Sequence, residues 1–83
     1  MRVTVKLFAT FRRYLPETSQ AGRCEIDLPV GAQVAEALAA SGLPGSACQA
    51  AVILLNGRTA HLDQVLQPDD VVTAFPAMAG GSA

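Results

Sequence analysis

Two consecutive glycines, Gly80 and Gly81, stand close to the carboxyl end of the sequence. Because glycine has no side chain, such a pair makes a thin, flexible thread that can enter a narrow slot in another protein. The thread can present a main-chain carboxylate to that protein's active site. Conversion to an acyl-adenylate then supplies a good leaving group, and sulfur or an amine can attack the carbonyl. Taken alone, the pair is more typical of a frayed tail.

The other reactive side chains do not form a catalytic or metal-binding pattern. Cys24 and Cys48 are widely separated and have no histidine nearby, which argues against a zinc site. We expect two buried or half-buried thiols rather than a disulfide. His61, the single histidine, is expected on the surface. The neighbouring Asp69 and Asp70 are typical of a turn rather than of an acid–base pair.

Composition limits the remaining function classes. The 83 residues are 51% hydrophobic, 16% charged and carry a formal net charge of -1, which predicts one globular domain. The weak charge argues against electrostatic binding of nucleic acid. No apolar run is long enough to cross a membrane. We therefore expect a cytoplasmic protein without nucleic-acid or membrane partners.

Hydrophobic periodicity predicts the elements that must position the glycines. Polar and apolar residues alternate over 2–9 and 23–28, which predicts two half-buried strands paired as a hairpin. Phe8 falls on the otherwise polar face of the first strand. Residues 10–15 are predicted to form a helical turn. A helix is predicted over 32–41, ending at a glycine cap.

The second half of the chain predicts a further hairpin and a last strand. The continuous apolar run at 52–55 predicts a strand buried on both faces, after a loop beginning at Gly45 and Ser46. Asn56-Gly57 is a strong turn signal leading into a short return strand. Residues 71–75 are predicted to form the last strand, ending at Pro76. This order indicates an α+β domain with a mixed sheet over residues 1–76 and a flexible tail over 77–83.

Four stretches of this chain resemble one protein family. They are the opening strand with Phe8-Ala9 and the Arg-rich turn that follows it, Val52-Ile53-Leu54-Leu55-Asn56-Gly57-Arg58, Leu66-Gln67-Pro68-Asp69-Asp70-Val71-Val72 and Phe75-Pro76-Ala77-Met78-Ala79-Gly80-Gly81. Together, in this order and at this length, they look like the small sulfur carriers of the molybdopterin synthase small-subunit and thiamin sulfur-carrier group (MoaD/ThiS). The resemblance implies a ubiquitin-like β-grasp fold with four to five strands and one main helix.

The resemblance also implies a chemistry centred on the tail. An ATP-dependent, E1-like activating enzyme would adenylate Gly81, and sulfur transfer would leave a C-terminal thiocarboxylate on it. Gly80 would give clearance for the approach. The carrier itself would bind no cofactor or metal, because ATP is used by the activating partner.

Four further residues are implied to contact the partners. Phe75, Pro76 and Met78 would help to seat the tail. Phe8 becomes a candidate interface residue, although scattered surface hydrophobicity and packing on the second face explain it as well.

The sequence departs from the family pattern at two places. Ala77-Met78 replaces a pair that usually contains proline, which is a minor change. Ser82-Ala83 extends the chain beyond Gly81, and a glycyl amide cannot be adenylated. We therefore expect a metallopeptidase to cleave between Gly81 and Ser82, as in relatives with a short extension. An artificial extension and a member that has lost the chemistry are the alternatives.

The resulting expectation is a sulfur carrier that acts with partner enzymes and is not an enzyme alone. The first candidate acceptor is a molybdopterin synthase large subunit. A protease-processed carrier for cysteine, homocysteine or another sulfur-containing metabolite is the runner-up. A ubiquitin-like modifier joined to lysines through Gly81 and a non-conjugated interaction module are alternatives of other classes. The sequence names neither the acceptor nor the oligomeric state.

Overall fold

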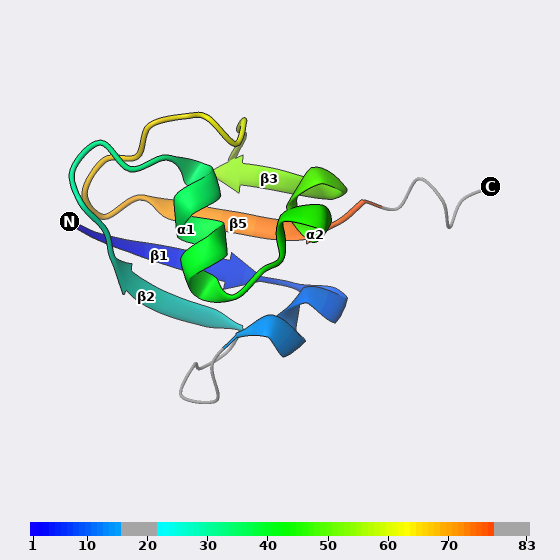
Figure 1. Ribbon diagram of the computed structural model, residues 1–83. Coiled ribbons are helices and arrows are strands. Elements are labelled where there is room, and N and C mark those ends of the chain that lie inside the picture. The colour runs from blue at the N-terminus through cyan, green and yellow to red at the C-terminus, as the bar shows by residue number, and fades with distance from the viewer. Residues whose placement is uncertain (16–21, 78–83) are drawn as a thin grey trace.

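The computed structural model describes residues 1–15 and 22–77 of the chain. Strands and short helices alternate along it (Figure 1). In chain order, the elements are β1 (Arg2–Leu7), the 3-10 helix η1 (Ala9–Tyr14), β2 (Arg23–Asp27), α1 (Val34–Ser41), α2 (Gly45–Gln49), β3 (Ala51–Leu55), β4 (Arg58–Thr59) and β5 (Val71–Pro76).

The strands form one mixed, five-stranded sheet in the order β2-β1-β5-β3-β4. β1 and β5, the first and last strands, lie side by side and parallel at its centre, with Thr4 opposite Val71. The pairs β1–β2, β3–β5 and β3–β4 are antiparallel. The expected hairpin between the first two strands and the mixed character of the sheet are therefore confirmed.

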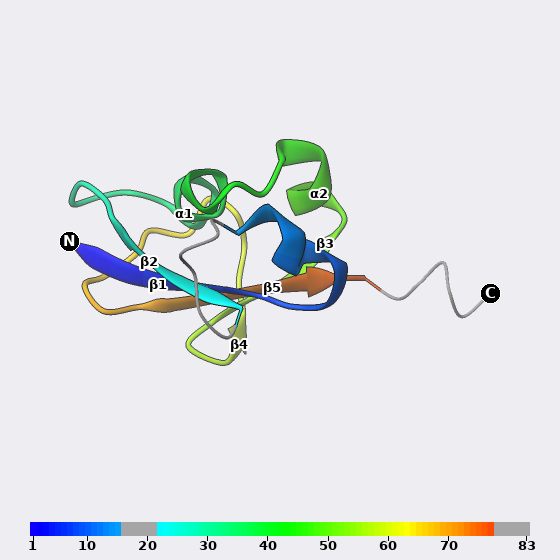
Figure 2. The ribbon, with the colours of Figure 1, turned by 90° about the horizontal axis from the view of Figure 1, so that it is seen from below.

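All helices in the described part of the chain lie on the same face of the sheet (Figure 2). The hydrophobic core fills the space between them and this inner face. Alternate residues of β1 supply much of it, as the sequence predicts, because successive side chains of a strand point to opposite faces. The core consists of Val3, Val5, Leu7, Phe11, Val34, Ala37, Leu38, Leu43, Cys48, Ile53, Ala60, Leu66, Val72 and Ala74.

Helix α1 begins two residues later than expected. The N–H groups of Val34 and Ala35 donate to the carbonyls of Gln64 and Leu62, at 2.9 Å each. The loop after β4 thus satisfies donors of the first helical turn, which have no partner within the helix. The end is as predicted, because Gly42 adopts φ +105 and its N–H donates to the carbonyl of Ala39.

Two expectations about the middle of the chain are wrong. Gly45 and Ser46 begin the short helix α2 instead of forming a loop. The strand β3 is not buried on both faces, because Ile53 is its single buried residue. Its inner face meets the helices, whereas no helix covers the outer face within residues 1–15 and 22–77 (Figure 2).

The turns agree with the sequence signals, whereas most of the tail predicted over 77–83 lies outside the described residues. Asn56 and Gly57 both adopt positive φ, 52 and 86, and connect β3 to β4. The residues expected to form a helical turn after β1 form η1. Within the described residues, no helix is both long enough and apolar enough to cross a membrane.

Candidate functional site

The outer face of the sheet carries apolar side chains near the carboxyl end of β5. In β5, Val72 and Ala74 are buried on the inner face, which places Phe75 on the outer face. Val52 of β3 stands opposite Phe75, and Leu54 stands opposite Thr73. Directly opposed residues of an antiparallel pair share a face, with Cβ atoms roughly 5 Å apart. Val52, Leu54 and Phe75 are each half-buried.

Phe8 extends this apolar area from β1. Its backbone is extended (φ -116, ψ 164), and its N–H donates to the carbonyl of Ala74 at 3.1 Å, prolonging the pairing of β1 with β5. Because Lys6 faces outward, the alternation places Phe8 on the same face two residues later. The Phe8 side chain remains 44% exposed.

We call Phe8, Val52, Leu54 and Phe75 the apolar patch. Each of three adjacent strands contributes to it, so the patch is fixed by the rigid centre of the sheet. Its four side chains carry no reacting group, so the apolar patch offers only a surface that a partner can cover.

The patch lies where the chain leaves the sheet toward its C-terminal residues. Pro76 is half-buried opposite Ala51, and the N–H of Ala77 donates to the carbonyl of Ala50 at 3.2 Å. The parallel strands β1 and β5 end at this same edge (Figure 1). Residues leaving β5 therefore start beside the apolar patch.

The residues to which the sequence assigns the chemistry lie outside the described part of the chain. These are Met78, Gly80, Gly81 and Ser82. Phe8, Phe75 and Pro76, which were expected to contact a partner, are brought to one edge of the sheet. The sequence reasoning missed Val52 and Leu54 as surface residues. Their position becomes clear only from the strand register, in which each of the two stands opposite an outward-facing residue of β5.

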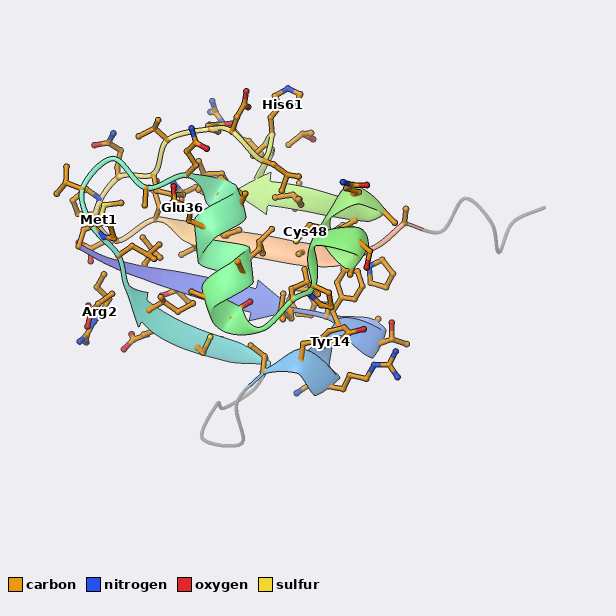
Figure 3. All side chains as sticks on the ribbon, in the orientation of Figure 1. Met1, Arg2, Tyr14, Glu36, Cys48 and His61 are labelled. Carbon is orange, nitrogen blue, oxygen red and sulfur yellow. The ribbon has the colours of Figure 1, made fainter. Side chains whose placement is uncertain are left out.

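The cysteines and the histidine are kept apart by the fold. Cys48 is the buried residue of α2 and Cys24 is half-buried on β2; neither forms a disulfide. Burial raises the pKa of the Cys48 thiol, and a backbone hydrogen bond opposes the rise. His61 is exposed and points away from the domain (Figure 3). Among the described residues, no group of three or more His, Cys, Asp or Glu could hold a metal ion.

The two neighbouring aspartates act in a turn, as expected. Asp69 adopts φ +68 within it. Asp70 is 9% exposed, and its Oδ1 accepts from Nδ2 of Asn56 at 2.9 Å while its Oδ2 accepts from the N–H of Gln67 at 2.7 Å. Oδ1 of Asn56 accepts from the N–H of Val71 at 2.9 Å. We call these three bonds the Asn56–Asp70 clasp, which ties the β3–β4 turn to the start of β5.

Comparison with known proteins agrees with the family resemblance. A model of the ThiS family matches residues 5–81. A Pyrococcus furiosus structure, provisionally described as molybdopterin converting factor, subunit 1, is 30% identical, with a TM-score of 0.65, and the match covers 90% of this chain and 95% of that one.

SAMP1 from Haloferax volcanii has a similar structure. It is 22% identical with a TM-score of 0.75, and the match covers 98% of this chain and all of that one. A second structure, described as H. volcanii small archaeal modifier protein 1, gives 22% identity, a TM-score of 0.70, and coverage of 90% and 95%. No curated protein shows significant sequence similarity to the chain. Together with the sheet order, these likenesses confirm the ubiquitin-like β-grasp fold.

Proposed function

The chain belongs to the ThiS family, and from this membership we propose that it is a cytoplasmic sulfur carrier whose reactive group is the carboxyl group of Gly81. An E1-like activating enzyme transfers AMP from ATP to this carboxylate and releases pyrophosphate. Hydrosulfide from a sulfur donor then attacks the carbonyl, so that a C–S bond forms, the bond to AMP breaks and a proton is released. The product is a thiocarboxylate, and the domain itself contributes no catalytic group.

The observation that best supports this proposal is the position of the apolar patch. Phe8 and Phe75 lie on the outer face at the edge where β5 ends, five residues before Gly80. A partner that covers the patch holds the start of the tail at a fixed place. Pro76 restricts the direction in which the backbone leaves β5, because its ring fixes φ. Gly80 and Gly81 then supply the narrow end of the thread.

The last two residues must be removed before this chemistry can occur. While Ser82 is attached, the carbonyl of Gly81 belongs to an amide and has no free carboxylate to adenylate. We propose that a metallopeptidase hydrolyses the bond between Gly81 and Ser82. Hydrolysis adds water and leaves the Gly81 carboxylate together with the dipeptide Ser82-Ala83.

The proposed acceptor is the large subunit of a molybdopterin synthase. Support comes from the 30% identity to the Pyrococcus furiosus protein described as subunit 1 of a molybdopterin converting factor. Delivery to an enzyme that makes cysteine, homocysteine or another sulfur-containing metabolite is the alternative within the same class, and processing of the tail favours it.

Protein modification is the alternative of another class. The likeness to small archaeal modifier protein 1 favours it at the level of the fold. The first step is shared, because an adenylated Gly81 can be attacked by a lysine amine instead of by sulfur. Amine attack gives an isopeptide bond with loss of AMP.

Intact-mass spectrometry separates these functions. Residues 1–81 are incubated with the activating enzyme of the source organism, ATP and a sulfur donor. A sulfur carrier gains the mass difference of one oxygen-to-sulfur exchange, whereas a modifier gives lysine-linked conjugates. The 83-residue chain should not react until its last two residues are removed. If residues 1–81 remain unchanged, the proposal is wrong.

A pair of matched variants tests the apolar patch in the same assay. Phe8→Ala should raise the apparent KM of the activating enzyme for the carrier at least about fivefold, the usual effect of removing an important interface aromatic. Val30→Ala is the control, because Val30 is 88% exposed but lies in the loop between β2 and α1. An equal effect of both substitutions would contradict a role for the patch.

A further inference from the structure

Four of the six basic residues of the chain gather at one end of the sheet. Lys6 near the end of β1 stands directly opposite Arg23 at the start of β2. Arg12 and Arg13 follow in η1, the element that continues from β1. We call Lys6, Arg12, Arg13 and Arg23 the cationic cluster.

Local contacts hold the two η1 arginines in place. Nε of Arg12 lies 3.0 Å from the position that a Cβ on Gly22 would occupy, so its guanidinium group packs over Gly22, the residue before Arg23. The guanidinium carbon of Arg13 lies 5.4 Å from the centre of the Tyr14 ring, a cation–π distance. Both arginines are exposed.

No carboxylate neutralises the cationic cluster within residues 1–15 and 22–77. Arg2, on the same strand as Lys6, shows the contrast: it pairs with Glu25 at 3.6 Å and with Asp27 at 3.4 Å. Arg2 and Tyr14 lie toward opposite ends of the sheet (Figure 3). Like charges directly opposite each other in a sheet are destabilising, by up to about 1 kcal/mol. Among the residues that the structure describes, Lys6 and Arg23 form such a like-charged pair.

The cationic cluster adjoins the apolar patch. Lys6 and Phe8 are two residues apart on the outer face, and Lys6 pairs with Thr73 of β5. The strands β1 and β5 run parallel, so the cluster lies at the edge where the chain leaves for Gly81. A protein that covers the patch and receives the tail must also face the cluster.

We propose that Lys6, Arg12, Arg13 and Arg23 form a docking surface for an acidic area on the enzyme that activates the C-terminal glycine, an inference that rests on the proposed function. The charges steer the carrier so that its tail approaches first. Steering of this kind raises association rates by about 10- to 1000-fold and weakens steeply with salt. A protein fits the surface better than a nucleic acid does, because the cationic cluster adjoins the apolar patch, which a protein surface can cover and a phosphate backbone cannot.

Association kinetics with the activating enzyme test the proposal. The double variant Arg12→Gln/Arg13→Gln should associate about tenfold more slowly than the parent chain at about 0.01 M salt, where the Debye length is about 30 Å. At about 1 M salt, where that length is about 3 Å, the two rates should converge. Arg12→Lys/Arg13→Lys keeps the charge and should keep the rate.

Arg2→Gln is the matched control, because it removes one positive charge from the other end of the sheet. The decrease in association rate, divided by the number of charges removed, should be much smaller for Arg2→Gln than for the double variant. An equal fall per charge would show that net charge alone matters and would overturn the proposal. So would an unchanged rate for the double variant at low salt. Melting temperatures of all variants identify any loss of folding, and the lysine variant corrects for it.

The outcomes separate this inference from the proposed function. If the parent chain is converted to the thiocarboxylate but the double variant associates at the same rate as the parent, the docking surface alone is refuted. If association depends on salt and is weaker in the double variant, but the parent chain gains no mass, the sulfur-carrier function alone is refuted. Absence of association refutes both. Tighter binding of poly(U) RNA than of the enzyme, lost in the same double variant, would assign the cluster to nucleic acid and overturn the proposal.

Discussion

Removal of the Asp70 carboxylate should destabilise the fold strongly. In the Asn56–Asp70 clasp, Oδ1 of Asp70 accepts from Asn56 in the turn after β3 at 2.9 Å, and Oδ2 accepts from the N–H of Gln67 in the turn before β5 at 2.7 Å. Asp70→Ala removes both acceptors. It leaves Nδ2 of Asn56 and the N–H of Gln67 in a part-buried position without their partner.

The expected loss follows from these two bonds. A hydrogen bond to a charged group contributes about 1.5–3 kcal/mol. Water can reach the part-buried donors and recover some of this, so we expect Asp70→Ala to cost about 2–4 kcal/mol. A chain of this length has a free energy of unfolding of about 4–12 kcal/mol. The variant should therefore melt at least about 8 °C lower than the parent.

Urea unfolding followed by circular dichroism measures the effect. Asp70→Asn keeps one carbonyl oxygen but turns an NH₂ group toward the second donor, so it should lose about half as much as Asp70→Ala. A double-mutant cycle with Asn56→Ala should give a coupling of at least about 1 kcal/mol, because contacting residues are not additive. A loss below about 0.5 kcal/mol for Asp70→Ala, or no coupling, would refute the assignment of stability to the clasp.

Two further predictions concern Cys48 and Gly42. Burial raises the pKa of the Cys48 thiol, so the folded protein holds this proton more tightly than the unfolded chain does. The contribution of this thiol to the free energy of unfolding should be complete below pH 9.0, the ordinary thiol value. It should be lost as the pH rises from there through the folded pKa. Urea titrations across this range should show a smaller fall for Cys48→Ala, and an identical fall would contradict the prediction. Gly42→Ala should destabilise the fold more than Gly31→Ala does. Both glycines have positive φ, +105 and +94, so backbone strain is similar in the two variants. The difference is that a Cβ on Gly42 meets the carbonyl of Tyr14, whereas a Cβ on Gly31 meets open space. Thermal melting compares the two variants. Backbone strain alone should lower the free energy of unfolding of Gly31→Ala by about 1–2 kcal/mol. An equal loss in both variants would contradict the prediction, because the contact with Tyr14 would then be relieved at little cost.

Features set by local periodicity could be predicted from the sequence. Val3, Val5 and Leu7 are fully buried as expected, because alternate residues of a strand share a face. Asn56 and Gly57 form the expected turn, because both accept positive φ. In these cases the residue type and its immediate neighbours decide the outcome.

Features set by contacts between distant segments could not be predicted in the same way. An apolar run such as Val52 to Leu55 does not reveal whether something covers its second face. Helix α2 begins with Gly45, a poor helix former, and it is held by packing of Cys48 into the core. The candidate site follows the same rule. Phe8 and Phe75 could be singled out individually, but their union with Val52 and Leu54 depends on strand register.

The parallel pairing of β1 with β5 has a consequence for the time course of folding. The first strand cannot gain its central partner until almost the whole described chain is present, since Thr4 pairs with Val71. Contacts between such distant residues require loop closure first and generally slow folding. In a chain that has not completed this step, β5 lacks its partner β1, so Phe8 is not yet beside Phe75 and the apolar patch is incomplete. A partner that recognises the patch and the tail together thereby selects fully folded molecules.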